Sequence, residues 1–133
     1  MSKPQHTLQF RVRYGETDQM GSYFNGHVLN WMEMGRTELS RHLGLPYAVW
    51  EQRGIFLPVV EAHLKFTGRA VYDTLLEMTT SVEPAGYVRL RFDNAIKNAE
   101  TGATVAHGYT IHAILNTEGK PVRMPEWVKA VVA

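Results

Sequence analysis

The 133-residue sequence contains no cysteine, no long hydrophobic run and almost no net charge. Without cysteine the chain cannot form disulfides, use a thiol as a nucleophile or bind zinc through thiolates. No stretch approaches the roughly 20 apolar residues that span a membrane, and the N-terminal residues lack the apolar core of a secretion signal. A formal net charge of +1, with both signs interspersed, gives no footprint for nucleic acid or a membrane surface. We therefore expect a cytoplasmic protein that binds a small molecule, with no nucleic acid or membrane partner and no metal site.

The composition that remains is that of an ordinary globular chain. Hydrophobic residues make up 44% of the sequence and charged residues 20%. A chain of this length leaves little room for a second hydrophobic core, and it contains no internal repeat or low-complexity segment. Residues 1–133 are therefore expected to form one domain.

The strongest periodic pattern predicts a helix over residues 26–43. Apolar and small residues recur there at spacings of three and four, at Val28, Trp31, Met32, Gly35, Leu39 and Leu43. Asn25 is placed to cap the start of this helix, and Gly44 followed by Pro46 ends it. Before the helix, residues 7–14 alternate apolar and polar side chains, as a half-buried strand does.

Four further strands are predicted after a short segment at residues 47–54. They lie between turn residues, at residues 55–66, 74–82, 87–97 and 104–115. This order indicates an α+β fold, with the helix packed on a five-stranded antiparallel sheet whose last four strands form a meander. One helix covers only part of such a sheet, and the apolar residues 55–60 need cover or a partner, so we expect oligomerisation.

A carboxylate next to a helix start is the main chemical signal in the sequence. Asp18 lies between the first strand and the predicted helix, and Asn25 lies at the helix start. The first turn of a helix presents unpaired N–H groups that can stabilise an oxyanion, while a nearby carboxylate attacks or activates water. The pairing predicts acyl-transfer chemistry, most simply hydrolysis.

The same segment carries a resemblance to a known family. Residues 11–21, 29–36 and 44–47 resemble the hotdog-fold thioesterases of the 4-hydroxybenzoyl-CoA thioesterase family. Weaker matches follow in the same order, at residues 58–62, 72–75, 108–110 and 123–125. The resemblance covers nearly the whole chain. It implies a hotdog fold, in which a five-stranded antiparallel sheet wraps a long central helix. It also implies homodimers or homotetramers with active sites at the dimer interface.

The resemblance also implies the reaction and its residues. Asp18 matches the family's nucleophile or general base, and the backbone N–H near Asn25 matches the donor that polarises the thioester carbonyl. Gly21 matches the glycine of the connecting loop. The implied reaction is hydrolysis of an acyl-CoA to the free acid and CoA, with no cofactor apart from the CoA of the substrate. A thioester on an acyl carrier protein stays open as the substrate.

Four further residues are predicted to contact substrate: Tyr23, Phe24, His27 and Glu61. Many relatives have histidine at the position of Asn25 and asparagine at that of His27, so the two residue types are exchanged here. Glu61 lies in an apolar stretch, where a carboxylate needs a partner.

Other charged residues have simpler expected roles. Glu16 is predicted to be a solvated loop residue, and Glu33 to pair with Arg36 on the helix surface. Arg69, Arg89 and Arg91 are the candidates for contacts with the phosphates of CoA.

Two alternative functions remain open from the sequence. Hotdog dehydratases use a histidine and a carboxylate, and in this chain His27 would have to supply the histidine. A protein that binds acyl thioesters without turnover would keep the pocket and lose the chemistry. Thiol release, enoyl absorbance without thiol release, and binding without either product distinguish the three functions.

Overall fold

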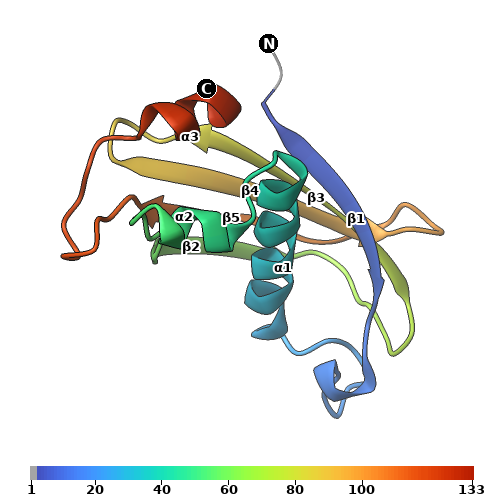
Figure 1. The fold of residues 1–133 in the computed structure, drawn as a ribbon. Coiled ribbons are helices and arrows are strands. Elements are labelled where there is room, and N and C mark those ends of the chain that lie inside the picture. Colours follow the sequence, from blue (N-terminus) through green and yellow to red (C-terminus); the bar gives the residue numbers. More distant parts are fainter. Residues whose placement is uncertain (1–2) are drawn as a thin grey trace.

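The computed structural model describes residues 3–133 and consists of one antiparallel sheet with helices on one side (Figure 1). The sheet has five strands, β1 (Gln5–Arg11), β2 (Val59–Phe66), β3 (Leu75–Pro84), β4 (Arg89–Asn98) and β5 (Thr104–Ala113). The helices are α1 (His27–His42), α2 (Tyr47–Gln52) and α3 (Glu126–Val132), with a 3₁₀ turn, η1 (Tyr14–Glu16), after β1. The long helix α1 crosses the sheet, which curves around it, so the predicted α+β hotdog fold is confirmed.

The strand order corrects the predicted four-strand meander. The order across the sheet is β1-β3-β4-β5-β2, and only β3, β4 and β5 are connected as a meander. β2 pairs with β5 at the far edge, and the chain then crosses to β3. The prediction was wrong because strand pairing is a long-range property that hydrophobic alternation in one strand does not encode.

Several element boundaries also differ from the prediction. α1 begins one residue later and ends one residue earlier than predicted. The first strand ends at Arg11, because the chain turns into η1 from Tyr14. β2 begins at Val59, and before it Phe56 forms only an isolated bridge with Leu115. The helices α2 and α3 were not predicted because each has fewer than two turns, too few to show a period of 3.6 residues.

The core lies between α1 and the inner face of the sheet. Trp31, Met32 and Leu39 of α1 are almost fully buried there. Gly35 marks the closest approach of helix and sheet, since a Cβ added at this position would collide with Thr80 Oγ1 and Met78 Cε. The absence of a side chain at this position lets the helix lie directly against β3.

Candidate active site

The loop between β1 and α1 is held in place by backbone hydrogen bonds, at the end of α1 distant from α3 (Figure 1). The Asp18 N–H donates to the Ser22 carbonyl, and the Gly21 N–H donates to the Asp18 carbonyl, both at 2.9 Å. Gly21 has φ +81°, a conformation that a residue with a side chain rarely adopts. The Tyr23 N–H donates to Ala70 at 3.0 Å and so ties the loop to the segment after β2. Asp18 therefore extends from an ordered backbone.

Asp18 is exposed and only partly engaged by the protein. Its Oδ1 accepts a hydrogen bond from the Met20 N–H at 2.8 Å. Within residues 3–133 no donor is bonded to Oδ2. This second oxygen is free to attack a carbonyl or to accept a proton from water.

The start of α1 carries two backbone donors without partners. The His27 N–H donates to the Phe24 carbonyl at 2.9 Å and the Val28 N–H to the Asn25 carbonyl at 3.1 Å. In the described part of the chain, the N–H groups of Asn25 and Gly26 donate to no acceptor. These two groups lie at the positive end of the helix macrodipole, where an oxyanion is stabilised.

The expected capping role of Asn25 is wrong. The N-cap residue is Gly26, and no side chain caps the helix start. Gly26 already has helical φ and ψ values of −62° and −24°, so the helical conformation begins one residue after Asn25. The Asn25 side chain is exposed, and the group that this residue leaves without a partner is its backbone N–H.

Four of the seven predicted site residues line one pocket, of about 330 Å³. They are Asp18, Tyr23, Phe24 and Asn25. The structure adds residues that the sequence analysis did not select, Phe66 from the end of β2 and Gly68 just after it. Arg69, which was considered only for phosphate contacts, also lines the pocket and donates to the Met20 carbonyl at 2.8 Å. Arg69 is the one arginine among the described residues that line this pocket.

The other three predicted site residues lie outside this pocket lining. Gly21 shapes the loop, and His27 packs its ring edge-on to Phe24 with 6.1 Å between ring centroids. Glu61 is exposed on β2, where the Tyr109 hydroxyl donates to its carboxylate at 3.1 Å. The partner expected for the Glu61 carboxylate is therefore the Tyr109 hydroxyl, on the neighbouring strand β5 of the same sheet.

Glu16 contradicts its predicted role as a solvated residue. Only 6% of it is exposed, and its carboxylate accepts hydrogen bonds from the Arg13 backbone N–H at 2.7 Å and the Trp31 indole N–H at 2.9 Å. Burial by itself raises the pKa of Glu16. These hydrogen bonds and the Arg13 charge together lower the pKa by more than burial raises it, so the pKa lies below its ordinary value. Glu16 fastens the loop to α1. No local pattern indicates this contact, because Trp31 follows fifteen residues later.

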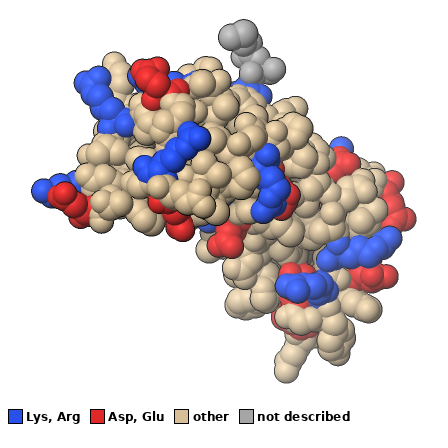
Figure 2. Space-filling view, in the orientation of Figure 1, with Lys and Arg blue, Asp and Glu red and all other residues tan. Residues whose placement is uncertain are grey.

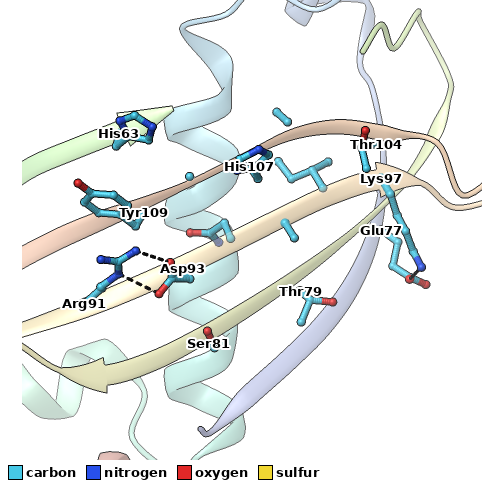
Figure 3. A pocket seen from close by; sticks show the side chains of 15 residues that line it. His63, Glu77, Thr79, Ser81, Arg91, Asp93, Lys97, Thr104, His107 and Tyr109 are labelled. Atoms are coloured by element: carbon cyan, nitrogen blue, oxygen red, sulfur yellow. Dashed lines mark hydrogen bonds and ion pairs between the residues drawn. The ribbon is translucent and has the colours of Figure 1, made fainter. Parts of the chain in front are cut away.

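The outer face of the sheet has a larger hollow, of about 750 Å³, which contains none of the predicted site residues (Figure 3). Its charged groups already have partners in the protein. Arg91 forms two hydrogen bonds with Asp93 and lies over the Tyr109 ring, and Lys97 pairs with Glu77. The pocket lined by Asp18 therefore stays the candidate site. Arg91 is held by Asp93 and does not line that pocket.

The remaining surface gives no other strong electrostatic signal. On the face seen in Figure 2, basic and acidic side chains are interspersed. No helix of the described residues is long and apolar enough to cross a membrane. Residues 3–133 also contain no group of three or more histidine and carboxylate side chains that could hold a metal ion.

The predicted Glu33 and Arg36 pair is confirmed, with 3.9 Å between the charged atoms.

Comparisons with known proteins agree with this fold. YneP of Bacillus subtilis (strain 168), provisionally named an acyl-CoA thioesterase, is 30% identical over 124 residues, which are 90% of this chain and 89% of YneP. The crystal structure of the hypothetical protein TT1821 from Thermus thermophilus is 30% identical, with a TM-score of 0.88 and coverage of 95% of both chains. A DHNA-CoA thioesterase structure from Staphylococcus aureus is 28% identical, with a TM-score of 0.86 and coverage of 95% of this chain and 87% of that one. The sequence model of the thioesterase-like superfamily matches residues 12–132, and the chain belongs to this family.

Proposed function

We propose that the chain hydrolyses acyl-CoA thioesters, with Asp18 as the reacting carboxylate and the N–H groups of Asn25 and Gly26 as the oxyanion site. Membership of a thioesterase family supports the enzyme class, thioester hydrolase. The observation that carries the residue assignment is that Asp18, an exposed carboxylate, and Asn25, which has a free backbone N–H beside the helix start, line the same pocket. No resident cofactor is needed, since CoA is part of the substrate.

Thioester chemistry fits this small set of groups. The leaving thiol has an ordinary pKa of about 8.5, so it departs as a thiolate without a strong general acid. As the carbonyl is attacked, its oxygen becomes an oxyanion that accepts hydrogen bonds from the two N–H groups. A preorganised pair of donors stabilises the transition state more than the neutral carbonyl of the ground state.

Two routes are compatible with the position of Asp18. In the nucleophilic route its carboxylate attacks the carbonyl carbon and expels CoA thiolate, and water then hydrolyses the mixed anhydride to restore the carboxylate. In the general-base route Asp18 accepts a proton from the water that attacks. Rapid quenching followed by mass spectrometry distinguishes them, because only the nucleophilic route leaves an acyl group on the peptide that contains Asp18.

The edge strand β2 supports assembly into dimers. It is exposed along most of its length, with Val59 and Val60 nearly half exposed, and it has a hydrogen-bonded neighbour on one side only. Pairing of two β2 strands would bury this edge. Phe66 belongs to β2 and lines the Asp18 pocket, so pairing would bring a second subunit to the pocket wall.

A thiol-release assay tests the proposal. Wild-type protein should release free thiol from acyl-CoAs, and Asp18→Asn should lower kcat/KM by roughly 10²- to 10⁴-fold. Glu100→Gln, which removes an exposed carboxylate from the β4–β5 hairpin, serves as the matched control and should leave the rate unchanged. Full activity of Asp18→Asn contradicts the residue assignment. Enoyl absorbance without thiol would favour dehydration, but His27 does not line the pocket.

A further inference from the structure

A second pocket lies farther along α1, between this helix, α2 and β5. It has a volume of about 320 Å³, and apolar side chains form much of its wall, namely Trp50, Leu57 and Phe92. None of the residues that line it also lines the Asp18 pocket. This volume and this mixture of apolar wall and few polar groups are typical of small-molecule sites.

Arg36 is the positively charged group of this second pocket, and Glu33, which also lines it, is the negatively charged one. The Arg36 side chain is 22% exposed, and its nearest carboxylate is Glu33, at 3.9 Å, whose side chain is 70% exposed. Within residues 3–133 the guanidinium donates no hydrogen bond to any acceptor. Burial lowers the pKa of Arg36, an effect that the Glu33 charge partly opposes. The Arg36 nitrogen atoms are not among the buried polar atoms that lack a partner, so a hydrogen-bond acceptor in the pocket can reach them.

Two other polar groups of the pocket, His112 and Ser40, already have partners. His112 is fully buried, and its Nδ1–H donates to the Leu57 carbonyl at 2.8 Å, because a carbonyl can only accept. Burial lowers the pKa of His112 to about 4, so the ring is neutral at neutral pH and its Nε2 accepts from the Thr110 hydroxyl at 2.9 Å. The Ser40 hydroxyl donates to the Leu45 carbonyl and accepts from the Trp50 indole. Since their hydrogen-bonding groups are used within the protein, His112 and Ser40 are poorly available to a ligand.

Tyr47 provides one more available donor. Its hydroxyl oxygen accepts from the Leu57 N–H at 3.1 Å, and within the described residues its own O–H proton has no acceptor. Arg36 and Tyr47 thus place a guanidinium and a phenolic O–H on the lining of one apolar pocket.

We propose that this pocket binds the carboxylate of a small organic acid with an apolar or aromatic body. The Arg36 guanidinium pairs with the two carboxylate oxygens, Tyr47 donates a further hydrogen bond, and the body packs against the aromatic wall. The carboxylate comes either from a free acid or from the far end of an acyl chain. The second source rests on the proposed thioesterase function; the binding itself does not.

NMR titration with benzoate tests the site directly. Benzoate should shift the indole N–H signal of Trp50, which lines the pocket, while the neutral analogue benzamide should bind at least about tenfold more weakly. Asp18→Asn should bind benzoate as the wild type does, which separates this site from the reactive pocket. Absence of a Trp50 shift at millimolar benzoate, or equal binding of benzamide, overturns the proposal.

Two variants with opposite expected effects assign the binding to Arg36. Arg36→Met keeps an unbranched side chain without the charge, and it should weaken benzoate binding roughly 10- to 100-fold. Glu33→Gln leaves Arg36 in place and removes the competing carboxylate, so it should strengthen binding. Arg91→Met, on the outer face of the sheet, is the matched control and should have no effect. The proposal fails if Arg36→Met binds benzoate as tightly as the wild type and a normally folded Glu33→Gln binds it no more tightly than the wild type.

Turnover distinguishes the two sources of the carboxylate. Arg36 lies nine residues beyond His27, about 14 Å along the helix axis, so the acyl chains should range from adipoyl-CoA to dodecanedioyl-CoA, each beside its monocarboxylic counterpart. A selective loss of kcat/KM for the diacid thioesters in Arg36→Met assigns an acyl tail. If Arg36→Met and the wild type hydrolyse the diacid thioesters with equal kcat/KM while benzoate binding still depends on Arg36, the carboxylate belongs to a free acid. Thiol release from the monocarboxylic series by wild-type protein tests the thioesterase function separately.

Discussion

The β1–α1 loop and the contact between α1 and the sheet meet at the same helix, but they use polar groups in opposite ways. In the loop, Asp18 is exposed and half of its carboxylate is free, while Glu16, two residues earlier, is buried and fully engaged. Beneath the helix, His112 and Asn94 are buried among apolar side chains. The loop keeps one carboxylate accessible and anchors its neighbour, whereas His112 and Asn94 beneath the helix are neutral groups that are each hydrogen-bonded within the core. Stability measurements should therefore separate the two regions.

The largest effect on stability is expected beneath the helix, from the protonation of His112. Burial, with a smaller contribution from the Arg36 charge and against the hydrogen bond to Leu57, lowers the pKa of His112 from 6.5 to about 4. Between these values the unfolded chain binds a proton that the folded protein does not, so stability falls as pH falls from 6.5 to 4. The loss is about 3 kcal/mol.

Urea unfolding between pH 7.5 and pH 4 measures this effect. His112→Gln removes the titrating group, so its free energy of unfolding should change less with pH than that of the wild type by up to about 3 kcal/mol. Identical pH dependence in the two proteins would show that His112 is protonated equally in the folded and unfolded states.

The second effect concerns the closest helix–sheet contact. Gly35→Ala adds a methyl group that collides with Thr80 Oγ1, which is itself hydrogen-bonded to the Asn94 amide at 2.7 Å. Alanine favours a helix by about 1 kcal/mol, but the overpacking outweighs this, and we expect a net loss of about 2 kcal/mol in the free energy of unfolding.

A matched substitution in the loop sharpens this contrast. Gly15→Ala adds the same methyl group where no atom lies within 4 Å, and it should leave the midpoint of urea unfolding within experimental error. Equal losses in the two variants would contradict the distinction between a tight helix contact and an open loop.

A smaller stability effect is expected at the anchor of the loop. The Arg13 and Trp31 N–H groups donate to different oxygens of Glu16, and Glu16→Gln replaces one of these oxygens by an NH2 group. One donor then loses its acceptor, and the free energy of unfolding should fall by about 1 kcal/mol. The salt bridge adds little, since the Arg13 side chain is 82% exposed. Because the anchor positions the loop, thiol release should also slow, with the change seen in kcat at saturating substrate. A normal rate with reduced stability would separate anchoring from catalysis.

The smallest effect on stability is expected at the residue with the largest proposed effect on rate. Asp18→Asn retains an oxygen for the Met20 N–H and leaves the core untouched, so the free energy of unfolding should change by no more than about 0.5 kcal/mol. Thermal unfolding followed by circular dichroism measures this. A large loss of stability would make Asp18 a structural residue of the loop and would weaken its assignment to catalysis.

Local patterns predicted the elements better than their arrangement. The spacing of apolar residues located α1 to within one residue at each end, because one long amphipathic helix has a clear period. The position of β2 beside β5 depends on pairing between distant residues, and α2 has too few turns to show a period. These features follow from tertiary contacts that no single stretch of sequence contains.

The candidate site divides in the same way. Asp18 and Asn25 were predicted from a motif within one loop, and the structure places both in one pocket. Phe66 was missed because it reaches the pocket from a different element. Glu16 was assigned to solvent because the burial of its carboxylate depends on the packing of Trp31. Sequence reasoning thus found the groups proposed to react, and it missed the groups that position and enclose them.

In the dimer proposed above, which pairs along β2, Phe66 would make the pocket wall depend on protein concentration. It lies on a strand whose outer edge has no neighbour in one chain, so any second copy that pairs there adds to the wall, and its departure opens the wall to water. Mass action then couples the fraction of complete pockets to the amount of enzyme present. Specific activity, normally constant for an enzyme, would fall as the protein is diluted below the dissociation constant of the pair.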